Sequence, residues 1–244
     1  MSSEKDRSIA LLKKELAANP IEAAAPVYQP IFFGEFSDVK TSLRRKPFLN
    51  KYSLIFSHLE KELSGKSVID VGANAGFFSF AAAQRGAAVD ALEPSRRYYD
   101  LCVKLARIYG ADGITFNNVS LSGDYLKGKS YDYGFFLSVL QWITEGNRRM
   151  DEGLSLLREL SLHVETLFFE LGCNSGRSAI RTDKLNHLAR VYRLLRENTV
   201  YGTIALIGMS GLWGPFSSRY IFLCSKKEVA VKEPFYASLK YINI

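Results

Sequence analysis

The segment 67–95 constrains the fold of this chain more than any other part of its sequence. It reads as a short apolar strand, a glycine-containing turn over 72–76, a helix over 77–84 and a second apolar strand over 87–92 that Glu93 ends. A strand–turn–helix–strand unit of this kind belongs to a parallel sheet, and it places the turn at the carboxyl edge, where ligands bind.

The turn and the acid that follows it favour a nucleoside ligand. Gly72 and Gly76 permit positive φ and a close approach of the backbone to a ligand, and the helix start presents free N–H groups. Glu93 stands at the tip of the second strand, where a carboxylate can accept both hydroxyls of a ribose. A tight connection without a ligand is the competing interpretation, but strand, turn, helix, strand and acid in this order favour cofactor binding.

The glycine spacing separates the two cofactors that this arrangement suits. A dinucleotide fingerprint has the spacing G-x-G-x-x-G, with a diphosphate over the helix. Counted from Gly72, Asn74 replaces the middle glycine and Phe77 the last one, which leaves little room for a diphosphate. S-adenosylmethionine (SAM) has no phosphate and carries a sulfonium cation, and Asp70 supplies negative charge near its amino acid end. SAM is therefore the favoured cofactor.

The same block resembles a known family. The run DVGANAGFFS followed by EPS is similar to motif I and the acidic motif of class I SAM-dependent methyltransferases, most of all the FkbM-type branch, which often O-methylates sugars and natural products. Segments 28–32 and 136–143 resemble small methyltransferases that act on bacterial polysaccharide ends. The class I pattern can be followed over most of the chain.

The order of apolar segments predicts an α/β fold. We expect a Rossmann-like, seven-stranded, mostly parallel sheet with helices on both faces and a C-terminal antiparallel hairpin. Strands are expected at 68–71, 87–92, 114–121, 131–139, 164–171, 203–209 and 219–224. Helices are expected at 8–18, 48–63, 77–84, 96–109, 147–163 and 182–197. Residues 1–46 are predicted to form an N-terminal helix and arm, and 47–244 the methyltransferase domain.

Composition and cysteine usage limit the other classes. The chain has 244 residues and a net charge of +7, but its basic residues form one tight cluster only, Arg44 to Lys46. No apolar run is long enough to span a bilayer, and the N-terminus lacks the apolar core of a signal peptide. The three cysteines are widely separated and show neither metal-ligand spacing nor a pairing framework. We therefore expect a cytoplasmic protein without a metal site.

The resemblance implies a set of cofactor contacts at the strand ends. The glycine turn is expected to line the methionine part of SAM, and Glu93 to bind its ribose. Because the family often has an acid where Ser120 stands, Asp124 is the alternative adenine contact. The remaining positions are the adenine edge at Pro94, Ser95, Ser120 and Leu121, the methionine floor at Ser138 and Val139, the turn residues Ala73 and Asn74, and the arm residues Tyr28, Gln29 and Arg45.

Methyl transfer requires alignment first, and a proton acceptor where the nucleophile is a hydroxyl. Glu170, at the end of an apolar strand, is the first candidate for a general base or for a ligand of the acceptor hydroxyl. A salt bridge to Arg177 or Arg181 is the competing interpretation. His187 is the second candidate. Related enzymes often read V-L-H-H at 139–142, where this chain has V-L-Q-W, so no histidine base is expected there.

Four functions compete on these residues. The leading hypothesis is SAM-dependent O-methylation of a sugar, a polysaccharide end or a natural product, so the expected partner is a small-molecule or glycan acceptor. RNA is the alternative acceptor: the basic charge supports it, but the N/D-P-P-Y/F signature is absent after the fourth strand. The missing third glycine opposes a nicotinamide-dependent oxidoreductase. The intact turn and Glu93 oppose a non-catalytic scaffold.

Overall fold

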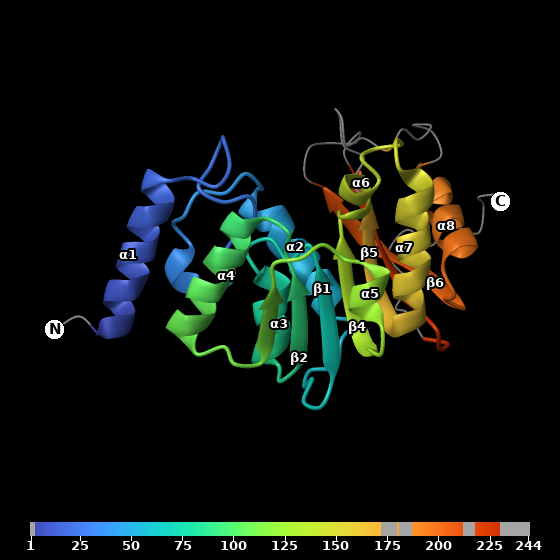
Figure 1. The fold of residues 1–244 in the computed structure, drawn as a ribbon, viewed down its shortest axis with the longest axis horizontal. Helices are drawn as coiled ribbons and strands as arrows, with labels where there is room; N and C mark the ends of the chain where they lie inside the picture. Colours follow the sequence, from blue (N-terminus) through green and yellow to red (C-terminus); the bar gives the residue numbers. More distant parts are fainter. Residues whose placement is uncertain (1–2, 172–179, 181–186, 212–217, 230–244) are drawn as a thin grey trace. The chain divides into compact units, whose positions relative to one another are not determined.

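The computed structural model describes residues 3–171, 180, 187–211 and 218–229 (Figure 1). The chain divides into two compact units, Met1–Leu49 with Lys61–Ser120, and Asn50–Glu60 with Leu121–Ile244. Seven strands form the sheet in the described part of the chain: β3, β2 and β1, in that order, come from the first unit, and β4, β5, β7 and β6 from the second. The predicted fold class is confirmed.

Three parallel strands form the sheet portion of the first unit: β1 (Ser67–Val71), β2 (Ala88–Leu92) and β3 (Ile114–Asn117). Val71 pairs with Leu92, and Leu92 with Asn117, so the carboxyl ends of these strands lie level. Two helices, α3 (Phe77–Gln84) and α4 (Arg96–Tyr109), follow β1 and β2. Both helices have the predicted bounds.

The N-terminal arm shares its hydrophobic core with α3 and α4. It contains α1 (Glu4–Ala18), capped by Ser3, and the short η1 (Gly34–Phe36). Figure 1 shows α1 beside α4, and Phe33 stacks on Tyr109 with 3.4 Å between the ring centroids. The shared cluster contains Ile9, Leu12, Leu16, Val27, Ile31 and Phe36 of the arm, with Ala75, Phe80, Tyr98, Leu101 and Leu105. The boundary between 46 and 47 stays a prediction.

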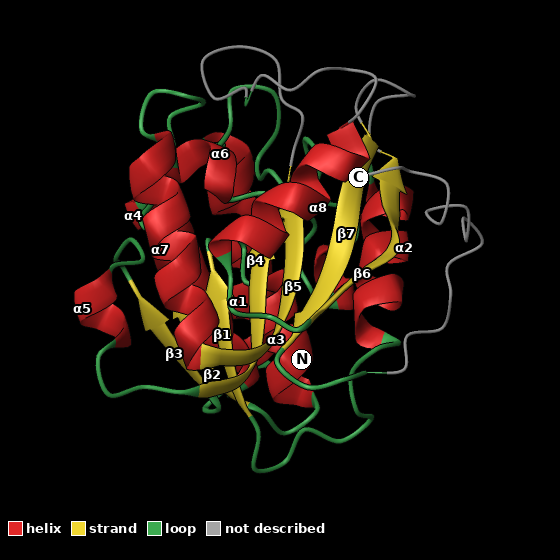
Figure 2. Ribbon diagram, turned by 90° about the vertical axis from the view of Figure 1, so that its right-hand side faces the viewer, coloured by secondary structure: helices red, strands yellow, loops and turns green. Residues whose placement is uncertain are grey.

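Parallel and antiparallel strands meet in the second unit. β4 (Tyr131–Leu137) runs parallel to β5 (Val164–Leu171), which pairs with β7 (Ser218–Ser225) in the antiparallel sense. β6 (Thr203–Gly211) pairs with β7, so the predicted C-terminal hairpin is confirmed. Figure 2 shows α8 (His187–Asn198) in front of β4 and β5, with α7 (Met150–His163), which contacts both β5 and α8, to its left.

Several predicted bounds are wrong for local reasons. α2 (Arg45–Phe56) begins earlier than predicted and does not reach 63, because Ser57 and His58 turn back onto Leu54 and Ile55. β4 ends before Ser138, whose φ of 60° is incompatible with a strand. Two four-residue helices were not predicted, α5 (Gly123–Leu126) and α6 (Leu140–Ile143). None of the helices in the described ranges combines the length and apolarity that a bilayer crossing needs.

Candidate functional site

The turn after β1 has three left-handed residues within five positions. Gly72 and Gly76 have φ of 73°, and Asn74 has φ of 53°, which asparagine tolerates better than most residues. A Cβ on Gly76 would lie 2.9 Å from a ring carbon of Phe80 and 3.1 Å from the sulfur of Cys102. The glycine at 76 is therefore required by packing beneath the turn as well as by its φ.

Hydrogen bonds fasten this turn on several sides. The amides of Gly72 and Ala73 donate to the carbonyl of Leu92 at 2.8 and 3.0 Å, so these two N–H groups are already used by the protein. The Cys102 thiol donates to the Asn74 carbonyl at 3.1 Å. Gln29 of the arm donates from Nε2 to the Ala73 carbonyl at 3.1 Å. The turn is thus held in one shape before any ligand binds.

Glu93 lies at the end of β2, with only 6% of its surface exposed. Its Oε2 accepts from the Asn74 amide at 2.7 Å, and its Oε1 accepts from the Ser95 amide at 2.8 Å. Burial raises the pKa of the Glu93 carboxyl, and the amides of Ser95 and Asn74 offset that rise only in part. Since an ionised carboxylate has about four acceptor positions, each oxygen keeps capacity for a hydroxyl.

Two further groups near the turn suit a ligand with a polar end. The Oδ1 atom of Asn74 is buried and has no hydrogen-bond partner within the described part of the chain. A buried polar atom of this kind calls for a donor. Asp70 is 4% exposed, and its Oδ2 accepts from Ser79 of α3 at 2.6 Å. The residues present therefore fit a nucleoside that carries an amino group.

The predicted arm residues lie in the same compact unit as the turn. The Tyr28 amide donates to the Tyr98 hydroxyl at 2.8 Å, and that hydroxyl donates to Glu22 at 2.6 Å. Gln29 is 8% exposed and touches the turn directly, whereas Arg45 is half-buried at the start of α2. Gln29 therefore shapes the turn, and contact of Tyr28 and Arg45 with a cofactor stays a prediction.

The predicted adenine edge is spread over two loops. Pro94 and Ser120 are exposed, and Leu121 is buried. Ser95 occupies the N-cap position of α4, but its side chain makes no capping hydrogen bond. Asp124, the alternative contact, is exposed and forms an ion pair with Lys127 at 2.6 Å.

Asn118 is a further residue of this site that was not predicted from the sequence. Its Nδ2 donates to the carbonyls of Glu93 and Pro94 at 2.8 and 3.1 Å. It follows β3 directly, and an amide side chain at a strand end was the signal for it. Asn118 therefore fixes the backbone that carries Glu93.

The second unit holds a fully buried carboxylate. Glu170 Oε2 accepts from Lys51 Nζ at 2.6 Å and from Ser138 Oγ at 2.5 Å, and Oε1 accepts from Ser210 Oγ at 2.6 Å. Burial alone raises the pKa of the Glu170 carboxyl, but the charges of Lys51 and Arg219 and the hydrogen bonds outweigh it and hold the pKa below its ordinary value. A shielded anion of this kind is a weak base.

The cation that pairs with Glu170 was not foreseen. Lys51 of α2 is its salt-bridge partner, whereas Arg177 and Arg181 lie outside the described residues. Arg219 adds to the cluster by donating to Ser138 Oγ at 3.2 Å. Catalysis by Glu170 stays a prediction, and its contacts favour a role in holding the backbone at the end of β4.

Ser138 and Val139 lead from β4 into α6. Ser138 has a left-handed φ of 60°, and its amide donates to the Glu170 carbonyl at 2.7 Å. Gln141 is 1% exposed and donates from Nε2 to the Ser138 carbonyl at 2.7 Å, but its buried Oε1 has no hydrogen-bond partner among the described residues. Trp142 is 65% exposed, so its side chain does not belong to the core.

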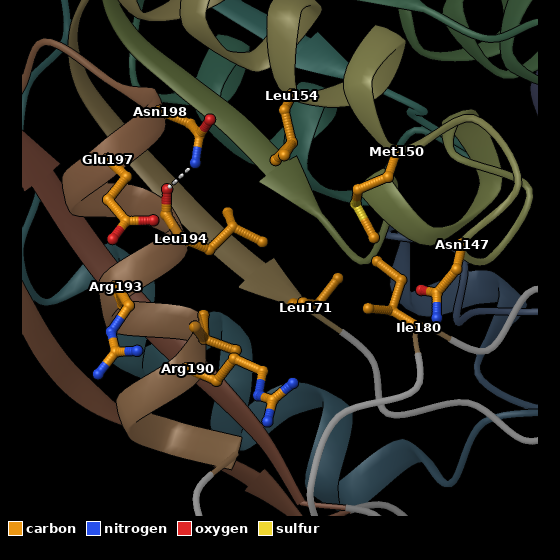
Figure 3. A pocket seen from close by; sticks show the side chains of 11 residues that line it. Asn147, Met150, Leu154, Leu171, Ile180, Arg190, Arg193, Leu194, Glu197 and Asn198 are labelled. Carbon is orange, nitrogen blue, oxygen red and sulfur yellow. Dashed lines mark hydrogen bonds between the residues drawn. The ribbon is translucent and has the colours of Figure 1, made fainter.

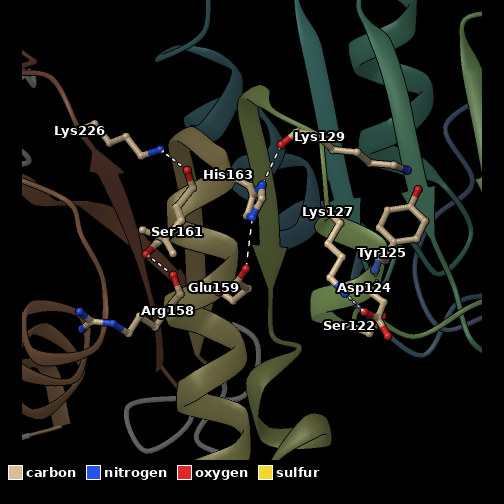
Figure 4. Close-up of polar contacts among 11 residues, drawn as sticks. Ser122, Asp124, Tyr125, Lys127, Lys129, Arg158, Glu159, Ser161, His163 and Lys226 are labelled. Carbon is tan, nitrogen blue, oxygen red and sulfur yellow. Dashed lines mark hydrogen bonds and ion pairs between the residues drawn. The ribbon is translucent and has the colours of Figure 1, made fainter.

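The histidines have structural surroundings where the structure describes them. His163, the last residue of α7, contacts the carbonyl of Lys129 through Nδ1 at 2.7 Å and Glu159 through Nε2 at 3.3 Å (Figure 4). His58 Nδ1 lies 2.9 Å from the Leu54 carbonyl. α8 begins at His187, but the side chain of this candidate lies outside what is described. No group of metal-ligating side chains occurs within the described residues.

Comparison with known proteins supports the fold. No protein-family model and no curated protein matches the chain in sequence. The bifunctional kinase-methyltransferase WbdD superposes with a TM-score of 0.68 at 20% identity, over 90% of this chain and 47% of its own. The chain thus spans about half the length of WbdD.

Two further structures share the fold. The N-terminal domain of EvdMO1 with S-adenosylhomocysteine (SAH) bound gives a TM-score of 0.62 at 13% identity, over 93% of this chain and 100% of the domain. Magnesium protoporphyrin IX methyltransferase (ChlM) from Synechocystis PCC 6803, with bound SAM, gives 0.55 at 20% identity, over 75% and 80%. The chain has the Rossmann-like fold of these methyltransferases.

Proposed function

We propose that this chain binds SAM and transfers its methyl group to an oxygen of a sugar, a polysaccharide end or a natural product. The observation that carries the proposal is the Glu93 carboxylate, which the turn residue Asn74 holds at the carboxyl end of β2. Solved structures with this fold include ones with SAM or SAH bound, which supports the choice of cofactor. The resemblance to the FkbM-type branch supports the oxygen acceptor.

The roles of the residues follow from their contacts. SAM, when bound, supplies a methyl group activated by the sulfonium. Glu93 accepts the ribose hydroxyls, and the buried Asn74 Oδ1 accepts from the amino group of the methionine part. The N–H of Gly72 already donates to the Leu92 carbonyl, so Gly72 contributes a close approach of its backbone to the ligand rather than a hydrogen-bond donor. Most of the catalytic effect then comes from alignment, to which a pre-shaped turn contributes.

The lowered pKa of Glu170 limits its use as a base. A carboxylate that is fully buried and bound by three donors cannot reach an acceptor in this conformation. We therefore assign Glu170 a positioning role: it holds Ser138 in its left-handed conformation at the end of β4. Transfer to a hydroxyl whose proton leaves to water needs no dedicated base.

Calorimetric titration of the purified chain with SAM, SAH and NAD tests the cofactor. We expect saturable binding of SAM and SAH and none of NAD. Binding of NAD alone would overturn the proposal, and failure of all three would favour a non-catalytic scaffold. Transfer of labelled methyl from SAM to sugars and glycan ends, with RNA as the competing acceptor, then tests the acceptor class.

A further inference from the structure

A pocket of about 330 Å³ lies between α7 and α8, beside Leu171 at the end of β5. In Figure 3, Met150 and Leu154 of α7 and Leu194 of α8 point toward one another across it. Its volume falls in the range of small-molecule sites, about 300–1,000 Å³. None of its lining residues belongs to the proposed cofactor contacts.

The inner walls of this pocket are apolar. Leu171, Ile180 and Val191 are buried at its base, whereas the facing side chains of Met150 and Leu154 are only half-buried. Half-buried apolar walls that face each other gain free energy when an apolar group displaces the water between them. The walls therefore suit the apolar body of a ligand.

The charged residues of the lining favour an anion. Arg190 and Arg193 stand one turn apart on α8 and are exposed, and Glu197 is the single carboxylate among the lining residues. Figure 3 shows Arg193 and Glu197 together at the edge of the pocket, away from the apolar walls, and the guanidinium group of Arg190 nearer to Leu171. Guanidinium groups recognise carboxylates and phosphates through paired N–H donors.

We propose that this pocket binds an amphipathic anion. Its apolar body lies against Met150, Leu154 and Leu194, its carboxylate or phosphate is held by the N–H donors of Arg190, and Arg193 adds positive charge one turn further along α8. The proposal does not depend on methyl transfer, because it rests on the pocket alone. It adds a second ligand site to the chain, at the carboxyl end of β5.

Titration calorimetry of the full chain with octanoate, octyl phosphate, hexanoate and octylammonium tests the proposal. Octanoate and octyl phosphate should bind saturably, and the tighter of the two identifies the preferred head group. Hexanoate should bind about tenfold more weakly than octanoate, because it lacks two buried methylenes. Octylammonium should bind at least about tenfold more weakly, because it cannot pair with guanidinium. Absence of saturable binding for both octanoate and octyl phosphate, or an equal affinity for octylammonium, would overturn the proposal.

Two variants with matched controls locate the binding. Arg190→Gln/Arg193→Gln should weaken octanoate binding about tenfold and remove the preference over octylammonium, whereas Arg196→Gln, on the same helix but outside the pocket, should not. Leu154→Trp should block the pocket, and Leu162→Trp, at a 52% exposed position of α7, should not. If circular dichroism shows that Leu154→Trp does not fold, octanoate binding by the Arg190→Gln/Arg193→Gln variant, whose two positions are exposed, still tests the proposal. Unchanged octanoate affinity in that pair places the binding elsewhere and rejects the proposal.

Discussion

Glu93 and Glu170 are two buried carboxylates whose surroundings shift their pKa values in opposite directions. Glu93 accepts hydrogen bonds from the backbone amides of Asn74 and Ser95, and burial raises the pKa of its carboxyl. Glu170 is also subject to burial, but Lys51 and Arg219 outweigh it, and its pKa is lowered. Glu93 is thus suited to gain from a ligand that donates hydrogen bonds, whereas Glu170 already has its donors.

Replacement of Glu93 by alanine tests the ribose contact. Hydrogen bonds to a charged group contribute about 1.5–3 kcal/mol each, so Glu93→Ala should weaken SAH binding by about tenfold or more. Calorimetry measures the change, and Glu62→Ala, at an exposed acid of the same unit, is the control. Equal SAH affinity in Glu93→Ala and the wild type would remove Glu93 from the site.

The raised pKa of Glu93 predicts that cofactor binding weakens in acid. Protonation removes the charge that accepts the ribose hydroxyls, so SAH affinity should fall as the pH drops toward that raised pKa, above the ordinary 4.5. The effect on folding has the opposite sign, because a raised pKa favours the folded state at low pH. Affinities from pH 8 to 5, with folding followed by circular dichroism, separate the two. A flat affinity profile would contradict the prediction.

Lys51 tests whether the buried cluster supports the second unit. Removal of one partner of a buried ion pair costs about 3–5 kcal/mol, so Lys51→Met should destabilise the chain strongly at pH 7, and Lys61→Met, at an exposed lysine, should not. The lowered pKa of Glu170 gives the wild type stability that is present above about pH 4.5 and is lost as the pH falls further. Urea unfolding measures the free energy of unfolding at pH 7 and pH 4. Between these two pH values, Lys51→Met should lose less stability than the wild type does.

A double variant provides the converse test. Adding Glu170→Gln should recover part of the stability that Lys51→Met loses, because no uncompensated charge is then buried. If the double variant is less stable than Lys51→Met alone, the interpretation of the cluster as a coupled pair is wrong.

The sequence predicts these residues unequally. Glu93 and the glycine turn follow from a local pattern, because one strand–turn–helix–strand unit contains them all. Lys51 could not be assigned to Glu170, since 119 positions separate the two and only the tertiary fold joins them. The orphaned Oδ1 of Asn74 and the thiol of Cys102 beneath the turn likewise depend on packing that no spacing reveals.

Helices and strands were predictable where a local stop signal exists. α4 ends where predicted because Gly110 adopts the left-handed conformation after Tyr109. α2 has no such signal. Its apolar spacing continues to Leu63, but this residue lies in the loop after α2, where its side chain is buried. α6 was not predicted because β4 ends before Ser138, whose left-handed φ cannot be foreseen for a serine.

The turn before α3 allows a paired test of this conformation. Gly76→Ala meets both a left-handed φ and close contacts with Phe80 and Cys102, and should cost about 2 kcal/mol or more. Gly110→Ala has the same strain but nothing within 4 Å of its new Cβ, so about 1 kcal/mol is expected. Urea unfolding compares them, and Gly76→Ala should also weaken SAH binding. Equal losses of stability would mean that packing beneath the turn contributes nothing.

At the scale of the whole chain, the packing of the N-terminal arm was the feature least predictable from the sequence. Its apolar residues indicate burial, but not against which surface. The structure places them on α3 and α4, in one cluster that includes Ala75 of the turn. Arm and turn should therefore unfold together, since loss of the arm exposes the apolar faces of both helices.

Phe36 tests this coupling, because it is 1% exposed in the arm and belongs to the shared cluster. Phe36→Ala should lower the free energy of unfolding by about 3–5 kcal/mol and weaken SAH binding, because the cavity loosens the layer beneath the turn. Leu11→Ala, at a position of α1 that is 69% exposed, should do neither. Urea unfolding followed by circular dichroism, with SAH titrations below the transition, measures both. If Phe36→Ala unfolds the arm separately and leaves SAH affinity intact, the arm is an appendage, and the turn keeps its shape through its hydrogen bonds to Leu92, Glu93 and Cys102.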